Sequence, residues 1–326
     1  MPRPQSASRP SPRSQRRPQT TVGPPRRRIA LSQNFLRNPA AVDAILGRSS
    51  IGPDDVVYEI GPGEGAITER LARRCRHVVA VEKDPRLAER LRHRFAACPN
   101  VTVFLDDALT FPLPVTRYKV FANVPFNVTA GIITRLTQAP NPPDDAYLGV
   151  QREAAQRYLG CPTETLVSVL LKPRFEPAIV HRFARRDFVP EPGVEVVLLR
   201  LRKRGPPLLA PHEAPRFRDF VAYGFTAWRP SLREAYAGIL DARVEQCLRE
   251  RTGRDLSLTP TALPFDAWLA LFRCFQEFAI ASAKARVAGA EARLRQQQAR
   301  LQKQHRTRSR TSPNNPATDA NVSEPR

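Results

Sequence analysis

Short apolar runs alternate with amphipathic segments over residues 56–201, and this alternation is the clearest structural signal in the chain. The candidate strands are Val56–Ile60, Val78–Glu82, Val101–Leu105, Tyr118–Ala122, Ala146–Val150, Ile179–Phe183 and Val194–Leu201. The candidate helices between them are Gly65–Arg74, Pro85–Ala97, Asn127–Gln138 and Glu153–Tyr158. Such an alternation, with about seven strands, predicts an α/β fold in which helices cover both faces of a mainly parallel sheet.

A different pattern begins after Lys203, where strand signals fade and apolar residues recur at helical spacing. Helical segments are predicted at Phe217–Phe225, Leu232–Arg251 and Phe265–Ala288, with breaks at Pro230 and over Leu258–Pro264. Ahead of the sheet, Asn38 followed by Pro39 is typical of a helix N-cap with proline at the first helical position. We therefore predict an α/β domain at 29–204, a small helical domain at 205–282, and terminal segments at 1–28 and 283–326.

The two terminal segments carry most of the formal net charge of +21. Residues 1–28 contain eight arginines and no acid, and residues 283–326 contain ten Lys or Arg against three acids. The first segment is proline-rich without a hydrophobic period, so we expect disorder there; residues 283–310 could extend the last helix, and 309–326 resemble a disordered tail. Such arms raise the affinity for any polyanion without reading its sequence. The alternative is a tail that serves solubility alone.

The composition argues against a membrane or secreted protein. No apolar stretch is long enough to span a bilayer, and the N-terminal segment lacks the apolar core of a secretory signal. The five cysteines are scattered and form no C-x-x-C pair, which favours reduced thiols and argues against a structural zinc site. We expect a cytoplasmic, monomeric protein that needs neither a membrane nor a metal.

A glycine-rich segment, Glu59-Ile60-Gly61-Pro62-Gly63-Glu64-Gly65, joins the first strand of the sheet to the next helix. Glycine permits a tight turn and lets backbone amides approach a ligand without an intervening Cβ. With Ala66 the pattern also satisfies the G-x-G-x-x-A fingerprint of nicotinamide-dinucleotide proteins. Two features favour S-adenosylmethionine over NAD. The segment has a third glycine, Gly65, and Glu59 is placed to interact with the amino acid end of an adenosyl cofactor.

Two acidic positions follow at the ends of later strands. Glu82 comes 21 residues after Gly61, where a carboxylate can accept both ribose hydroxyls of an adenosine-containing ligand, whichever cofactor that is. The alternative for Glu82 is a solvated carboxylate. Asp107, in the pair Asp106-Asp107 after the third strand, is our candidate acceptor for the adenine amino group. Its alternative is a helix N-cap.

The segment Asn123-Val124-Pro125-Phe126 follows the fourth strand and carries the reaction chemistry. An aromatic amine is a poor nucleophile because its lone pair is delocalised into the ring. The Asn123 side-chain oxygen and a neighbouring carbonyl can accept its two N–H bonds and aim the lone pair at a sulfonium methyl group. Pro125 fixes the turn, and Phe126 can stack on the base. Positioning and electrostatics then supply most of the acceleration. An ordinary Asn-x-Pro turn is the alternative.

These segments, in this order, resemble the ribosomal RNA adenine-N6 methyltransferases. The resemblance spans residues 29–275 and rests on Leu31–Leu36, Glu59–Gly65, Glu82, Asp107, Asn123–Asn127, Phe188–Leu201 and Trp268–Phe272. It implies a Rossmann-like class I methyltransferase fold with S-adenosylmethionine as cofactor. By resemblance, the cofactor contacts are Asn34, Leu36, Gly61, Glu82, Asp107 and Asn123. The chain departs from the commonest family motif with Val124 for Ile and Phe126 for Tyr, which leaves mono- versus dimethylation open.

The superfamily has two main branches. One dimethylates adjacent adenines of small-subunit rRNA during ribosome assembly, and the other, the erythromycin-resistance (Erm) branch, modifies one adenine of 23S rRNA. The Leu-Ser-Gln-Asn-Phe start, the arginine-rich arms and the Trp-Leu-Ala-Leu-Phe ending look like actinobacterial Erm proteins, whereas Gly-Pro-Gly is closer to the assembly branch. We favour 23S rRNA as the partner, with resistance to macrolide- or lincosamide-type antibiotics. A nicotinamide oxidoreductase and a non-catalytic RNA-binding relative, as among mitochondrial transcription factors of this fold, remain as alternatives.

Overall fold

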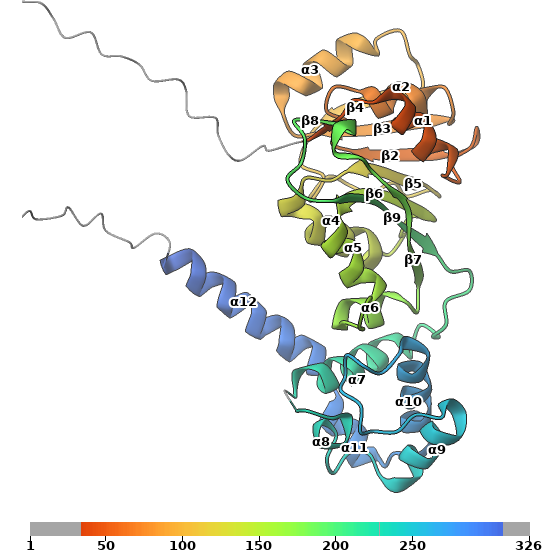
Figure 1. Cartoon of the computed structure of the whole chain (residues 1–326), viewed down its shortest axis with the longest axis vertical. Helices are drawn as coiled ribbons and strands as arrows, with labels where there is room; N and C mark the ends of the chain where they lie inside the picture. The colour runs from red at the N-terminus through yellow and green to blue at the C-terminus, as the bar shows by residue number, and fades with distance from the viewer. Residues whose placement is uncertain (1–33, 228, 309–326) are drawn as a thin grey trace, which may run out of the picture. The chain divides into compact units, whose positions relative to one another are not determined.

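The computed structural model describes residues 34–227 and 229–308 (Figure 1). Within them, a seven-stranded sheet has the strand order β4-β3-β2-β5-β6-β9-β7. Its strands are β2 (Val56–Ile60), β3 (His77–Glu82), β4 (Val101–Leu105), β5 (Lys119–Asn123), β6 (Asp145–Gln151), β7 (Phe175–Arg182) and β9 (Val196–Lys203). The strands from β4 to β6 pair in parallel, and β9 pairs antiparallel with both β6 and β7. The predicted α/β fold with a mainly parallel sheet is confirmed.

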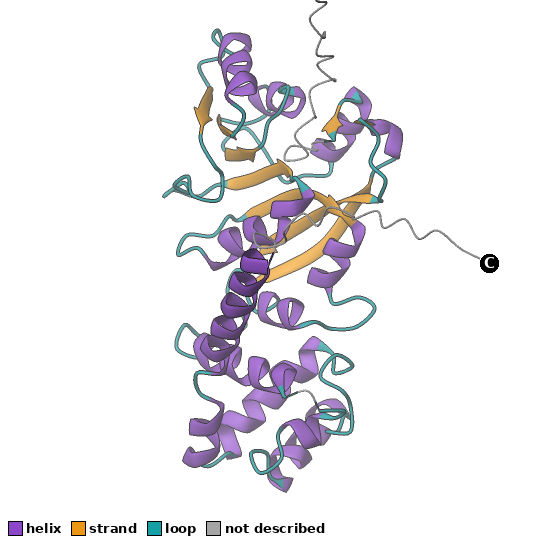
Figure 2. Cartoon of the chain, turned by 90° about the vertical axis from the view of Figure 1, so that its left-hand side faces the viewer, coloured by secondary structure: helices purple, strands orange, loops and turns teal. Residues whose placement is uncertain are grey.

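Helices pack against both faces of this sheet, because successive strand residues point to opposite faces. Val57 belongs to an apolar cluster with residues of α1 and α2, whereas Tyr58 and Ile60 belong to a cluster with α4 and α5. Figure 2 shows the orange strands with helices on either side. The helices of this region are α1 (Pro39–Gly47), α2 (Ala66–Ala72), α3 (Pro85–Arg94), α4 (Thr129–Gln138), α5 (Arg152–Leu159) and α6 (Leu166–Leu171).

Helices α1, α3 and α6 of this region begin with a side-chain N-cap. Asn38 caps α1, since its side-chain oxygen accepts from Ala40 N at 3.1 Å and Pro39 takes the first helical position, as the sequence predicted. The short helix α6 was not predicted. Its six residues, Leu-Val-Ser-Val-Leu-Leu, form an apolar run too short to show a helical period. A reciprocal capping box between Thr165 and Ser168 starts this helix.

The region after β9 is helical, as predicted, but two of the predicted segments are each divided in two. The helices are α7 (Ala214–Thr226), α8 (Leu232–Ala235), α9 (Ala242–Thr252), α10 (Phe265–Phe278), α11 (Ala281–Val287) and α12 (Ala290–Arg308). The chain turns between α8 and α9 at Gly238, which has a φ of +68°, and Asp241 caps α9. Ala279 is extended and separates α10 from α11.

The packed core of this helical region continues beyond residue 282, where the sequence analysis ended it. Ala283 and Val287 of α11 are buried in the same apolar cluster as Trp268 and Phe220. Helix α12 lies within residues 283–310, where the sequence allowed an extension of the last helix. None of the helices in residues 34–227 and 229–308 is both long and apolar enough to cross a membrane.

The prediction that all five cysteines are reduced is wrong for one pair. Cys247 of α9 and Cys274 of α10 form a disulfide, and both side chains are buried where these two helices pack together. Cys75, Cys98 and Cys161 are free. The sequence gives no signal for this pair, because its two members are 27 residues apart and only the packing of α9 on α10 brings them together.

Candidate active site

The glycine loop connects β2 to α2 at the carboxyl edge of the sheet. Gly61, Gly63 and Gly65 have φ angles of +65°, +60° and +84°, which disfavour residues with a Cβ. A Cβ on Gly63 would also lie 2.9 Å from two ring carbons of Phe35, and one on Gly65 would lie 2.8 Å from Leu91 Cδ2. The loop therefore packs closely against the segment around Phe35 and against α3.

Glu82 ends β3 directly beside this loop and is 1% exposed, which excludes the solvated carboxylate that the sequence left open. One oxygen accepts from Gly63 N at 3.1 Å, and the other accepts from Lys83 N and Asp84 N at 2.9 Å each. A carboxylate has about four acceptor positions, so three of them are already used. Glu82 thus fixes the glycine loop to the start of α3, and one acceptor position is left for a ligand.

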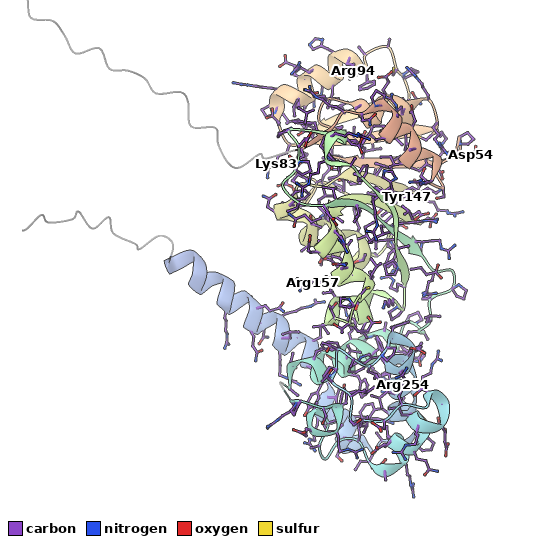
Figure 3. The ribbon with its side chains drawn as sticks, viewed as in Figure 1. Asp54, Lys83, Arg94, Tyr147, Arg157 and Arg254 are labelled. Atoms are coloured by element: carbon purple, nitrogen blue, oxygen red, sulfur yellow. A yellow bond between two sulfur atoms is a disulfide. The ribbon has the colours of Figure 1, made fainter. Side chains whose placement is uncertain are left out.

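Asp107 lies beyond the end of β4 and is partly exposed. Its side chain accepts from Lys83 Nζ at 2.7 Å and from Leu109 N at 2.9 Å, and the hydrogen bond from Lys83 lowers the pKa of Asp107. Figure 3 labels Lys83. The next assigned element after β4 is β5, so Asp107 caps no helix here and instead closes a turn. An adenine amino group would have to share this carboxylate with Lys83.

Glu59 is buried beneath the loop, on the face of β2 that carries Val57. Its side chain is 1% exposed, and neither carboxylate oxygen has a hydrogen-bond partner among the residues that the structure describes. Burial raises the pKa of Glu59 to about 8, an effect that the nearby Thr68 hydroxyl only partly offsets. With this raised pKa, the Glu59 carboxyl group is mostly protonated at pH 7. A cationic ligand bound beside it would favour the ionised form.

Asn123 is the last residue of β5, and its side-chain amide has a fixed orientation. Its Nδ2 donates to the backbone oxygen of Asn34 at 2.6 Å. A carbonyl oxygen can only accept, so the amide nitrogen must face Asn34, and Asn123 Oδ1 remains available as an acceptor. Beside it, a Cβ on Gly149 of β6 would lie 3.1 Å from Oδ1, so this glycine leaves space around the acceptor.

Pro125 and Phe126 follow Asn123 and turn the chain away from the sheet. Pro125 precedes a 3-10 helix, Phe126–Val128, and its carbonyl already accepts from Val128 N at 3.1 Å. Phe126 is half-buried and contacts the same apolar cluster as α1 and α2. The ring thus contributes to the core and retains exposed surface.

A short segment that includes Asn34 and Leu36 crosses the site and is held by a distant part of the chain. The two-residue strand β1 (Phe35–Leu36) pairs with β8 (Phe188–Val189). Asp187 then accepts from Arg37 N and Asn38 N through its backbone oxygen, and from Asn38 Nδ2 at 2.7 Å through its side chain. Arg37 also pairs with Glu64 of the glycine loop at 2.8 Å. Residues 31–33 of the resemblance lie outside the described residues.

A narrow pocket brings several predicted site residues together. Its lining includes Leu36, Gly61 and Asn123, with Phe35, Pro62, Glu64, Ala66 and Ile67. Asn34 joins this group through its hydrogen bond with Asn123. Glu82 accepts a hydrogen bond from Gly63 of the loop, and the Asp107 side chain is linked to this edge of the sheet through Lys83. Lys83 and Asp187 could not be found from the sequence, because each acts through a tertiary contact. Their positions next to Glu82 and Phe188 were the only local signal.

Comparison of this chain with known proteins shows which family it belongs to. The model of the ribosomal RNA adenine dimethylase family matches residues 25–276. An rRNA adenine N-6-methyltransferase of Aeromicrobium erythreum is 37% identical over 222 residues, which are 66% of this chain and 65% of that protein. An rRNA methyltransferase of Streptomyces thermotolerans is 36% identical over 68% of this chain and 77% of that protein. This chain therefore spans slightly under two thirds of the Aeromicrobium relative.

Solved structures agree with these sequence matches. The 23S rRNA methyltransferase ErmE is 30% identical with a TM-score of 0.70, and the match covers 74% of this chain and all of that one. A dimethyladenosine transferase of Plasmodium falciparum, 20% identical with a TM-score of 0.63, shares the fold. The matched family region includes the glycine loop, Glu82, Asp107 and Asn123–Phe126. The chain belongs to the ribosomal RNA adenine dimethylase family.

Proposed function

We propose that this protein transfers a methyl group from S-adenosylmethionine to the N6 amino group of one adenine in 23S rRNA. The oriented amide of Asn123 carries the proposal, because it presents a free acceptor at the carboxyl edge of the sheet beside the glycine-loop pocket. Family membership and the 30% identity to ErmE over the whole of that chain support it. A nicotinamide oxidoreductase is not proposed, since it would leave Asn123–Phe126 without a role.

The chain's own groups would prepare the target amine. Asn123 Oδ1 accepts one N–H of the adenine amino group, and a main-chain carbonyl accepts the other. Pro125 O already accepts from both Val128 N and Thr129 Oγ1, which occupy its two lone pairs, so we assign the second acceptor to Val124 O. Two acceptors favour a pyramidal nitrogen whose lone pair points away from the ring, and Phe126 stacks on the base. The amino nitrogen would bond to the methyl carbon as the carbon–sulfur bond of the sulfonium breaks with its electron pair going to sulfur, and the nitrogen would then release one proton to water.

The residues around the pocket fit an adenosyl cofactor. S-adenosylmethionine, when bound, supplies a methyl group on a sulfonium, which is already a good leaving group. The three glycines allow its approach to the backbone, Glu82 offers an acceptor to the ribose, and Asp107 offers one to the adenine amino group. Glu59 is a buried carboxyl group without a hydrogen-bond partner among the described residues, and a cationic amino acid group bound beside it would favour its ionised form.

Small-subunit rRNA is the second candidate substrate, and one set of observations favours it. A protein of Synechococcus named ribosomal RNA small subunit methyltransferase A is 34% identical over 263 residues, covering 76% of this chain and 91% of that one. Its coverage exceeds that of the Aeromicrobium relative. The two candidates share the same chemistry at Asn123 and differ in the RNA that is modified.

Primer extension on both rRNAs separates the two candidates. The wild-type chain and Asn123→Ala are expressed in a macrolide-sensitive bacterial host, and RNA is extracted. We expect one reverse-transcriptase stop, at an adenine of 23S rRNA, together with raised macrolide tolerance. Asn123→Ala should lose both while keeping most of its S-adenosylmethionine affinity. A stop confined to small-subunit rRNA would overturn the proposed substrate, and an active alanine variant would overturn the mechanism.

The degree of methylation and the oligomeric state are tested separately. Mass spectrometry of digested rRNA distinguishes N6-methyladenosine from N6,N6-dimethyladenosine, which the substitution of Tyr by Phe126 in the motif leaves open. Light scattering on the purified chain tests the expected monomeric state. A stable dimer in solution would contradict that expectation without affecting the chemistry.

A further inference from the structure

Helix α12 is a basic helix with little packing of its own. Over residues 290–308 it contains six Lys or Arg and a single acid, Glu291. Ala290 is buried and Leu294 is half-buried, whereas Arg293 and all of residues 295–300 are exposed. In Figure 1, α12 extends away from the helices α7–α11. A helix that is polar on all sides gains little from tertiary burial.

The first turn of α12 is nevertheless held firmly by two adjacent residues of α7. Arg218 donates to both carboxylate oxygens of Glu291, at 2.5–3.0 Å. Asp219 accepts from Gly289 N at 2.8 Å and from Glu291 N at 3.1 Å, so it satisfies backbone N–H groups at the start of α12 that the helix itself cannot pair. We call Arg218, Asp219, Gly289 and Glu291 the α7–α12 anchor.

Beyond this anchor the sequence of α12 is strongly basic. Glu291 is shared by Arg218 and Arg295, the latter at 2.7 Å. The sequence after Glu291 adds five more basic residues and no acid before residue 309. From Arg293 to Arg308 the helix presents charge over roughly 22 Å, at 1.5 Å per residue. A basic helix thus begins at the residues that α7 holds.

We propose that α12 is an RNA-binding arm that contacts the phosphate backbone of the substrate rRNA, and that the α7–α12 anchor sets its direction. The partner rests on the proposed function. A phosphate backbone is favoured over a protein surface because α12 has no aromatic residue, and only two leucines interrupt its polar and alanine residues. Protein interfaces depend on apolar and aromatic centres, whereas phosphate binding depends on Lys and Arg.

Two matched pairs of substitutions test the charge. Arg300→Gln with Lys303→Gln removes two charges from α12. The control, Arg243→Gln with Arg254→Gln, removes two from exposed positions at α9 and just beyond it (Figure 3 labels Arg254). Binding of a 23S rRNA transcript that contains the peptidyl-transferase region is measured in 50 and 200 mM salt. Methyl transfer kinetics are measured alongside.

The α12 pair should reduce the salt slope by about 1.4–1.8, so the ratio of Kd between the two salt concentrations should shrink about tenfold. The KM for RNA should rise at low salt while kcat changes less than about twofold, since the chemistry belongs to the pocket. The control pair should change the slope far less. Equal effects of the two pairs would overturn the proposal, as would an unchanged slope, the result expected if α12 bound an acidic protein instead.

A third variant tests whether RNA binding depends on the direction of α12 or on its charge alone. Asp219→Asn with Glu291→Gln raises the net charge by two and releases α12 from α7. A fixed arm then binds rRNA more weakly, whereas an undirected tether binds it more tightly, and tighter binding would refute the anchor's role. Circular dichroism and thermal unfolding show whether the helical region stays folded. If the wild-type chain methylates no rRNA, the proposed function fails; if it does and the α12 pair matches its control, only this inference fails.

Discussion

Replacing Glu59 by glutamine should stabilise the cofactor-free protein at alkaline pH and leave its stability near pH 4 almost unchanged. The side chain is 1% exposed, and its two oxygens have no hydrogen-bond partner among the described residues. Burial raises the pKa of Glu59 to about 8, and the neighbouring charge of Glu82 adds to that effect. Above that pH the folded protein must hold an unpaired buried anion, which glutamine avoids.

The sign and size of the effect follow from proton linkage. The unfolded chain releases this proton near pH 4.5, and the folded protein keeps it until about pH 8. Between these values the folded state binds more protons, so the contribution of Glu59 to the free energy of unfolding falls as the pH rises. The full difference between the two pKa values corresponds to at most about 5 kcal/mol, at about 1.4 kcal/mol per pKa unit.

Thermal and denaturant unfolding of the wild-type protein and Glu59→Gln at pH 5, 7 and 9 measure this difference. The variant should gain stability progressively, reaching a rise in Tm of several degrees at pH 9, at about 2–4 °C per kcal/mol. Glu89→Gln, at an exposed position of α3, is the matched control and should show no such trend. Parallel pH profiles for the wild-type protein and Glu59→Gln, or a variant less stable at every pH, would refute the reasoning.

Three further substitutions or treatments test other parts of the site and fold. Phe126→Ala should lose most methyl transfer and Phe126→Tyr should keep it, because stacking contributes about 1–3 kcal/mol per base; a fully active alanine variant would make this ring a core residue only. Glu82→Gln should weaken S-adenosylmethionine binding by calorimetry and also lower Tm, since its amide group would face backbone donors; unchanged affinity would remove Glu82 from the cofactor site. Protein denatured without reductant should titrate three free thiols, because Cys247 and Cys274 are joined, and five would contradict the disulfide.

The sheet could be predicted from the sequence because each strand contains a short, mostly apolar run. The predicted strands at 56–60 and 101–105 coincide with β2 and β4, and the others differ by a few residues at their ends. Buried parallel strands require such runs, so the pattern is strong. Helix α6 escaped prediction because six residues are too few to show a period, and its capping box uses serine in place of the usual glutamate or glutamine.

The environment of the acidic residues could not be predicted in the same way. The sequence placed Glu59 and Glu82 at the ends of neighbouring strands, which is where the structure has them. It did not indicate that both are buried, or that three backbone donors satisfy Glu82 while Glu59 has none. That difference depends on how the glycine loop and α3 fold around each carboxylate, which no local pattern specifies. Burial without a partner also raises the pKa of Glu59.

The Asn123 motif is recognisable in the local sequence, but the orientation of its side chain depends on distant residues. The motif is local, because an amide, a proline and an aromatic ring must follow one strand. The orientation of the amide comes from Asn34 O, 89 residues earlier in the chain. The segment around Asn34 is held in turn by Asp187 and by the pairing of β1 with β8, about 150 residues further on in sequence. Asn123 thus keeps a free acceptor only while three distant segments stay together, so loss of the Asp187 contacts should impair methyl transfer even though that residue lines no part of the pocket.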